Sequence, residues 1–210
     1  MMKHSLLIAC LAGTPVAAEP VTWTLDRGHA HIGWEIDHMG LSRTVGRFNT
    51  FDGTFMIDEE NPENSRITFW IDAASIDSNH DARDAHLRGT DYFDTETHPR
   101  MTFSSTRVEM LTHDRGKLHG ELTMRGQTAP VTLDFRMVRD RTYPEFIPGY
   151  DQIRVAGFEA KAEVARLDHG MDFIAFLDSP TGFVAHVDIR LDLVLCEGVS
   201  AENTPCNWGR

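Results

Sequence analysis

The sequence predicts an all-β fold of about eight strands that a short helical segment interrupts once. Along most of the chain apolar and polar residues alternate, which gives each segment one apolar face. Most of these segments are joined by short turns, which favours antiparallel neighbours. A set of such strands protects its edges by closing into a barrel or by packing as two sheets.

The alternating segments mix large and small residues on their apolar faces. They are residues 30–37, 51–58, 67–73, 101–106, 118–124, 131–138, 156–164 and 183–193. Gly53, Gly120 and Ala160 stand among phenylalanines on these faces. Small residues opposite large ones either fill a core or leave a channel, and the periodicity does not decide between the two. Eight strands are enough for a barrel that encloses one small ligand.

Residues 76–99 break the alternation and predict a short helix followed by turns. Asp77 and Ser78 are residue types that cap helix N-termini, and Gly89 is a typical stop signal. Leu87 and Phe93 supply apolar groups that the segment can bury. We expect this segment to lie as a plug or lid across an open end of the β structure.

The composition limits the class of partner. The 210 residues are 41% apolar and 25% charged, which is ordinary for one soluble domain. The formal net charge is -12, and no clustered cationic face is visible. This balance argues against nucleic acid and against electrostatic docking on anionic lipid headgroups. It leaves neutral lipid open.

Residues 1–18 predict a secretory signal peptide and therefore a periplasmic protein that begins at residue 19. Lys3 gives a weakly positive start, residues 6–12 form a short apolar run, and residues 16–18 read Val-Ala-Ala before the cleavage site. The run is too short to span a bilayer. Cys10 follows Leu-Ile-Ala, which looks like a lipoprotein box and is a competing interpretation.

If Cys10 leaves with the leader, Cys196 and Cys206 remain, both in a C-terminal extension of residues 196–210. Two cysteines in an exported chain predict one disulfide. The alternative is two free thiols. The spacing does not match a cysteine metal site.

The histidines are the main candidates for metal or acid–base chemistry. His29 and His31 suggest a metal pair on one strand face, and His80 and His86 flank the helical segment. Neither pair has the spacing of a zinc motif, and there is no Gly-x-Ser-x-Gly, P-loop or dinucleotide fingerprint. We therefore expect no catalytic residue, no metal and no cofactor. The alternatives are a metal-dependent or stress-related enzyme that uses these histidines, and a solid barrel that serves as a protein-interaction module.

Short motifs are distributed along nearly the whole mature chain. They are His38-Met39-Gly40-Leu41-Ser42, Gly46-Arg47-Phe48, Phe51-Asp52-Gly53, Asp72-Ala73-Ala74-Ser75-Ile76-Asp77, Arg83-Asp84-Ala85-His86-Leu87-Arg88, Asp91-Tyr92-Phe93-Asp94, His98-Pro99, Thr102-Phe103-Ser104-Ser105-Thr106, Gly120-Glu121-Leu122-Thr123-Met124-Arg125-Gly126, Pro130-Val131-Thr132-Leu133, Gly157-Phe158 and Gly170-Met171. In order and spacing, over about residues 22–195, they resemble the YceI family of exported, lipocalin-like polyisoprenoid-binding proteins. The resemblance implies that residues 19–195 form an eight-stranded antiparallel barrel, with a helical lid between the third and fourth strands and an apolar pore. It also implies binding of a polyisoprenoid or fatty amphiphile, and no catalysis.

The sequence departs from the family pattern in three places. His169 stands where a phenylalanine is usual, which makes the loop of residues 166–171 more polar. The connection of residues 139–152 is rich in aromatics and prolines, as a flap over the barrel mouth or a packed Ω-loop would be. The tail with the two cysteines is an extension.

The alternation and the resemblance together give a candidate binding site. Six inward aromatic residues are expected to line the pore: Trp34, Phe55, Phe69, Phe103, Phe135 and Phe158. A polar head, such as a quinone or a phosphate, is expected at the mouth near His38, His86 or Arg88. These facings depend on the alternation, and a shift of one residue would invert them. A homodimer and a transient contact with a membrane are left open.

Overall fold

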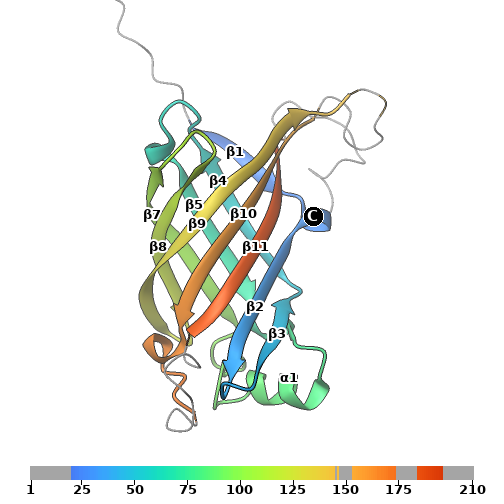
Figure 1. Cartoon of the computed structure of the whole chain (residues 1–210), viewed down its shortest axis with the longest axis vertical. Coiled ribbons are helices and arrows are strands. Elements are labelled where there is room, and N and C mark those ends of the chain that lie inside the picture. Colours follow the sequence, from blue (N-terminus) through green and yellow to red (C-terminus); the bar gives the residue numbers. More distant parts are fainter. Residues whose placement is uncertain (1–19, 145, 147–152, 174–183, 196–210) are drawn as a thin grey trace, which may run out of the picture.

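The computed structural model describes residues 20–144, 146, 153–173 and 184–195, and it shows an elongated barrel (Figure 1). The strands are β1 (Val21–Leu25), β2 (His31–His38), β3 (Ser42–Phe48), β4 (Phe51–Ile57), β5 (Arg66–Asp72), β6 (Ile76–Asp77), β7 (Arg100–Met110), β8 (Arg115–Met124), β9 (Gln127–Thr142), β10 (Arg154–Ala165) and β11 (Val184–Leu195). The helical elements are the 3-10 turns η1 (Arg27–His29), η2 (Pro62–Asn64), η3 (Ala73–Ser75) and η4 (Arg166–His169), and the α-helix α1 (Asp81–Arg88).

The barrel is closed by eight antiparallel strands in the order β1-β4-β5-β7-β8-β9-β10-β11, and β11 pairs again with β1. At the closure, Thr24 lies opposite Val194 and Leu25 opposite Leu193. Closure leaves no free edge in the ring, so its backbone groups find partners without a second sheet. The expected eight-stranded barrel with one short helix before the fourth predicted strand is confirmed.

Three strands were not expected, namely β1, β3 and β6. β2 corresponds to the predicted segment 30–37. It pairs with one part of β11, while β1 pairs with another part of the same strand. β3 then pairs with β2, and β6 with β3, so these strands extend the sheet beyond the ring. Alternation did not indicate β3 because Thr44 and Gly46 pair with inward positions of β2, so its inner face is not uniformly apolar. The predicted connection of residues 139–152 also begins later, since β9 continues to Thr142.

Helix α1 lies across the lower end of the barrel in Figure 1, and its cap differs from the predicted one. The N-cap is His80, whose Nδ1 accepts the N–H of Arg83 at 3.2 Å. Ser78 instead donates its own amide to the buried Asp84 carboxylate at 2.9 Å. Gly89 does end the helix, but with a φ of -73°, so it is not a left-handed stop.

Arg88 fastens the helix to the extension of the sheet. Its Nε donates to the carbonyl of Ala74 at 2.8 Å and its guanidinium also donates to the carbonyl of Ile76 at 2.7 Å. After the helix, the ring of Phe93 meets Phe48 edge-on, with centroids 5.9 Å apart. The lid is therefore held by hydrogen bonds from the Arg88 side chain to backbone carbonyls and by an aromatic contact between Phe93 and Phe48.

The buried apolar side chains form separate clusters within the described residues. One, towards the lid, consists of Ile32, Phe48, Ala73, Ile76, Met101, Met124 and Met171. Another, in the other half of the barrel, consists of Trp23, Leu25, Phe55, Ala156 and Leu193. Phe51 and Phe69 pack against both. The interior is thus lined by apolar side chains at two levels.

Several predictions from the sequence lie outside the described residues. They are the leader of residues 1–18 with Cys10, the Cys196–Cys206 disulfide and the extension of residues 196–210. Among the residues that are described, no helix is long and apolar enough to cross a membrane.

One carboxylate of the barrel wall gives a pH-dependent test. Burial raises the pKa of the half-buried Asp192 above its ordinary value of 3.8; His29 opposes this shift and the carboxylate of Asp26 adds to it. A folded-state pKa above the unfolded one means that ionisation weakens the fold as the pH rises through this window. Asp192→Asn should therefore increase the free energy of unfolding at about pH 7, with a gain that shrinks towards pH ~4.

The measurement is denaturant unfolding of parent and variant across that pH range. Asp188→Asn on the same strand is the matched control, because its carboxylate is paired with Arg190 and should gain nothing from the change. A constant difference between Asp192→Asn and parent at all pH values would contradict the assignment.

Candidate functional site

A cavity of about 910 Å³ lies inside the barrel. Its wall includes residues from all eight strands of the ring, from β2 and β3, and from α1. The volume is at the upper end of the range for small-molecule pockets, which are also predominantly apolar. The interior is therefore not packed solid, and the alternative of a filled core is wrong.

The wall contains all six aromatic residues that the sequence analysis placed in the pore: Trp34, Phe55, Phe69, Phe103, Phe135 and Phe158. Small side chains lie between them. On β10, Ala156, Ala160 and Ala162 line the cavity on the same face as Phe158. The strand thus presents little bulk to the lumen along most of its length.

Four of these rings lie against glycines of the neighbouring strand. The pairs are Trp34 on Gly46, Phe69 on Gly53, Phe135 on Gly116 and Phe103 on Gly120. A Cβ at the glycine would stand 2.3, 2.7, 2.8 and 2.4 Å from the nearest ring atom, respectively, which is closer than atoms can approach. The first three pairs are direct cross-strand partners, and the fourth is diagonal. The rings are therefore folded down onto the wall.

The two ends of the cavity differ in charge. At the end under the lid, the charged residues and histidines in the wall are Asp37, His38, His80, Arg83, His86 and Arg166. At the opposite end, formed by the β4–β5 and β7–β8 hairpins and the end of β9, they are Asp58, Glu59, His113, Asp114 and Asp140 (Figure 1). One mouth is thus mainly cationic or imidazole-bearing, and the other mainly acidic.

Two carboxylates of the acidic end, Asp58 and Asp114, have a lowered pKa. Hydrogen bonds from the amide of Asn61 and the side chain of Asn64 hold the pKa of Asp58 below its ordinary value. The hydroxyl of Thr112 likewise lowers the pKa of Asp114. A negatively charged group would be repelled from this mouth.

Glu59 and Asp140, at the same end, are bridged by one arginine. Arg154 donates to Glu59 at 2.7 Å through Nη1 and to Asp140 at 2.9 Å through Nε. The bridge ties the β4–β5 hairpin to β9 and β10, so these two carboxylates have a structural role as well.

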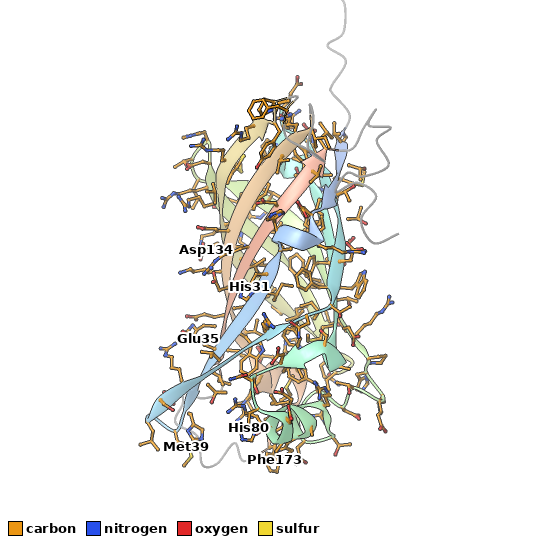
Figure 2. The ribbon with its side chains drawn as sticks, turned by 90° about the vertical axis from the view of Figure 1, so that its right-hand side faces the viewer. His31, Glu35, Met39, His80, Asp134 and Phe173 are labelled. Carbon is orange, nitrogen blue, oxygen red and sulfur yellow. The ribbon has the colours of Figure 1, made fainter. Side chains whose placement is uncertain are left out.

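The lid end gathers aromatic and imidazole groups. His86 meets Tyr92 and Phe173 edge-on, with centroid distances of 5.0 and 5.2 Å, and its Nε2 lies 2.8 Å from Asp91. Figure 2 shows Phe173 and His80 beside α1. His38 from β2 also lines this mouth.

Of the three residues predicted to meet a polar head, His38 and His86 line the cavity. Arg88 is not part of the wall, because its guanidinium is directed to the carbonyls of Ala74 and Ile76. The sequence analysis missed Arg83, which lies one helical turn before His86 and does line the cavity. Helical spacing from His86 could have indicated it.

The remaining histidine predictions are also changed by the structure. His29 lies in η1, with Nδ1 2.9 Å from Asp26, while His31 lies in β2, so the two do not share a strand face. His169 is only 2% exposed and its Nδ1 lies 3.1 Å from the carbonyl of Gln127. It is not part of the cavity wall, so it does not make the mouth more polar. Within the described part of the chain, no group of three or more metal-binding side chains is found.

Comparisons with known proteins agree with this architecture. The model of the YceI-like domain matches residues 23–195. Protein YceI of Escherichia coli O6:H1 is 37% identical over 175 residues, which cover 80% of this chain and 86% of that protein. A UPF0312 protein of Photorhabdus laumondii is 40% identical over 140 residues, or 67% of this chain and 69% of that one.

Solved structures are similar in fold at low sequence identity. BcnA of Burkholderia cenocepacia superposes with a TM-score of 0.65 at 20% identity, over 81% of this chain and 98% of that one. A polyisoprenoid binding domain from Saccharophagus degradans gives a TM-score of 0.58 at 13% identity, over 81% of this chain and 97% of that one. At these identities the likeness concerns the fold alone.

The contact between Trp34 and Gly46 can be tested by a double-mutant cycle. Gly46→Ala should destabilise the protein by about 1–3 kcal/mol, because the new methyl group must displace the indole ring. In a Trp34→Ala background the same change should cost clearly less, since the two closest ring atoms are gone and the Asp77 carbonyl, at 2.9 Å, is a looser contact. Unfolding in denaturant measures all four proteins. Equal costs in both backgrounds would show that the ring does not need the glycine.

Proposed function

The chain belongs to the YceI-like family, and on that premise we propose that it binds one long apolar amphiphile, a polyisoprenoid or a fatty chain of similar size, inside the barrel. The barrel acts as a carrier or store, with no chemical change to the ligand. The observation that carries the proposal is the apolar cavity of about 910 Å³. The fold shared with a polyisoprenoid binding domain supports it.

The driving force is the removal of hydrocarbon from water. The free energy of binding becomes more favourable by about 25 cal/mol for each Å² of apolar ligand surface that is removed from water. A lumen walled by aromatic rings, leucines and alanines offers that environment without a membrane. Because the rings are folded onto the wall, the ligand does not have to displace them.

We place the polar head of the ligand at the lid end. His38, His80, Arg83 and His86 line this mouth and provide hydrogen-bond donors for a quinone carbonyl or a phosphate. The acidic residues at the opposite mouth would repel an anionic head, so the tail points towards them. This arrangement gives the ligand one orientation in the barrel.

Binding without catalysis suits the way these polar groups are used. His80 caps α1, and Arg83 donates to the hydroxyl and the carbonyl of Ser78 at 2.7 and 2.6 Å. His86 is held by Asp91. Each of these side chains supports the lid, so their presence at the mouth has a structural reason. The predicted leader motivates the further proposal that the protein works in the periplasm.

Filling the lumen provides the test of this function. Ala160 lies in the middle of β10 and lines the cavity. Ala160→Trp should weaken uptake of a fluorescent isoprenoid at least about tenfold, which corresponds to about 1.4 kcal/mol. The fold should remain largely intact because the indole enters existing space. Uptake and the unfolding midpoint are both measured on delipidated protein, since bound ligand raises apparent stability.

The matched control is Lys161→Trp, which adds the same ring to the outer face of the same strand and should leave uptake unchanged. Severe unfolding by Ala160→Trp would contradict an open lumen. A stably folded Ala160→Trp protein with unchanged uptake would show that the ligand does not occupy the middle of the barrel.

A further inference from the structure

The hairpin between β2 and β3 projects beyond the barrel wall at the lid end, and Figure 2 shows Met39 at its tip. Three residues, Met39, Gly40 and Leu41, connect β2 to β3, and the first two have φ values of 56° and 70°. The N–H of Leu41 donates to the carbonyl of His38 at 3.0 Å. These values define a type I′ turn, which fixes the tip tightly to its two strands.

Gly40 suits this turn, but Met39 does not. The first position of a type I′ turn favours asparagine, aspartate or glycine, because its φ is positive. Asn79 and Asp94 are described residues of a type that tolerates a positive φ, whereas Met39 and Arg125, which each precede a glycine in a hairpin turn, are not. The methionine gains little burial in exchange, since it is 49% exposed.

The tip also exposes more apolar surface than the fold requires. Leu41 is 80% exposed and Val45, further along β3, is 58% exposed. Scattered apolar residues are normal on a surface, but here three lie on one projecting hairpin beside the cavity. Met39 itself lines the cavity mouth, whereas Leu41 and Val45 do not, so the exposed apolar surface meets the interior at Met39.

The hairpin has an open flank that faces the lid. Among the described strands, β3 pairs on this side only with β6, at Arg47 and Phe48, which leaves the edge from Ser42 to Gly46 without a partner strand. His80 and Ala82 at the start of α1 line the cavity together with Met39, and all three are exposed. The cavity therefore reaches the surface between the hairpin and α1.

The charges around the tip exclude an anionic surface as its partner. Residues 38–42 read His-Met-Gly-Leu-Ser and contain no lysine or arginine, and the adjacent Asp37 accepts a hydrogen bond from the amide of Gly40 at 2.7 Å, which places a carboxylate at the turn. The nearest arginines are neutralised, Arg43 by Glu35 and Arg47 by Asp77. The whole chain carries a formal charge of -12. An apolar tip without net positive charge suits the interface of an uncharged or zwitterionic bilayer.

We propose that the tip of the β2–β3 hairpin, Met39 and Leu41, inserts into the surface of a zwitterionic bilayer, and that lipid enters the barrel between this hairpin and α1. The docking step follows from the exposed tip. The entry step rests on the proposed function, because it presumes a lipid ligand. Docking brings the gap beside β3 against the membrane, so the lipid does not have to cross open water.

The test compares charge insertion at the two ends of the barrel. Leu41→Asp should weaken co-sedimentation with phosphatidylcholine vesicles about tenfold or more, because the variant would have to bury a carboxylate in the bilayer where the parent buries a leucine. Transfer of a fluorescent isoprenoid from these vesicles should slow by a similar factor. Leu111→Asp, 57% exposed on the β7–β8 hairpin at the opposite end, is the matched control and should change neither.

Two further measurements separate the possible outcomes. Leu41→Trp should show a blue-shifted emission that brominated lipid quenches, and Leu111→Trp should not. Uptake of the isoprenoid from detergent should be the same in Leu41→Asp and in the parent. If no variant binds isoprenoid but Leu41→Asp still loses vesicle binding, docking stands and the proposed function fails.

Equal vesicle binding by parent, Leu41→Asp and Leu111→Asp would overturn docking through this hairpin. A second contradicting result would be a parent protein that does not bind vesicles and forms a dimer, with Leu41→Asp converting the dimer to monomers. The tip would then be a contact between two copies of the chain.

Discussion

The contact of aromatic rings with glycines on neighbouring strands is the constraint that keeps this barrel hollow. Side chains that project straight from an inward position would meet across the lumen, as they do in a filled core. Instead, Trp34, Phe69, Phe103 and Phe135 turn down onto Gly46, Gly53, Gly120 and Gly116. Each ring covers bare backbone and leaves the axis free. The large side chains thus form an apolar wall around a cavity of about 910 Å³.

The two ends of the closed wall differ in charge and in the elements that form them. The acidic end is tied together by Arg154, which joins Glu59 to Asp140. The lid end is built from α1, which Arg88 fastens to the backbone of Ala74 and Ile76. Between the lid and the barrel stands the extra hairpin of β2 and β3, which is not part of the closed ring. The polarity of the mouths and the position of this hairpin make the two ends of the molecule chemically different, and the proposed loading and ligand orientation rest on that difference.

The sequence was sufficient to predict the faces of the long strands, because a period of two depends only on the backbone. It placed all six aromatics in the wall for this reason. It could not predict the ring–glycine contacts, because these depend on which residue lies opposite on the next strand. Gly46 illustrates the difficulty: it is small because Trp34 lies on it, and the same smallness hid strand β3 from the alternation. Arg83 and Arg88 are both basic residues of α1, but they point in different directions around the helix. Arg88 binds the carbonyls of Ala74 and Ile76, whereas Arg83 lines the mouth of the cavity.

The most direct test of the central claim is native mass spectrometry of the full-length protein, purified from its own cells without detergent. If the lumen is an open apolar tube, the folded protein should carry one non-covalent adduct, and organic extraction should release an apolar chain with a polar head. The extracted protein should take up one molecule of added isoprenoid. Protein that shows only its polypeptide mass, and that remains without an adduct after incubation with isoprenoids and fatty amphiphiles, would contradict the account.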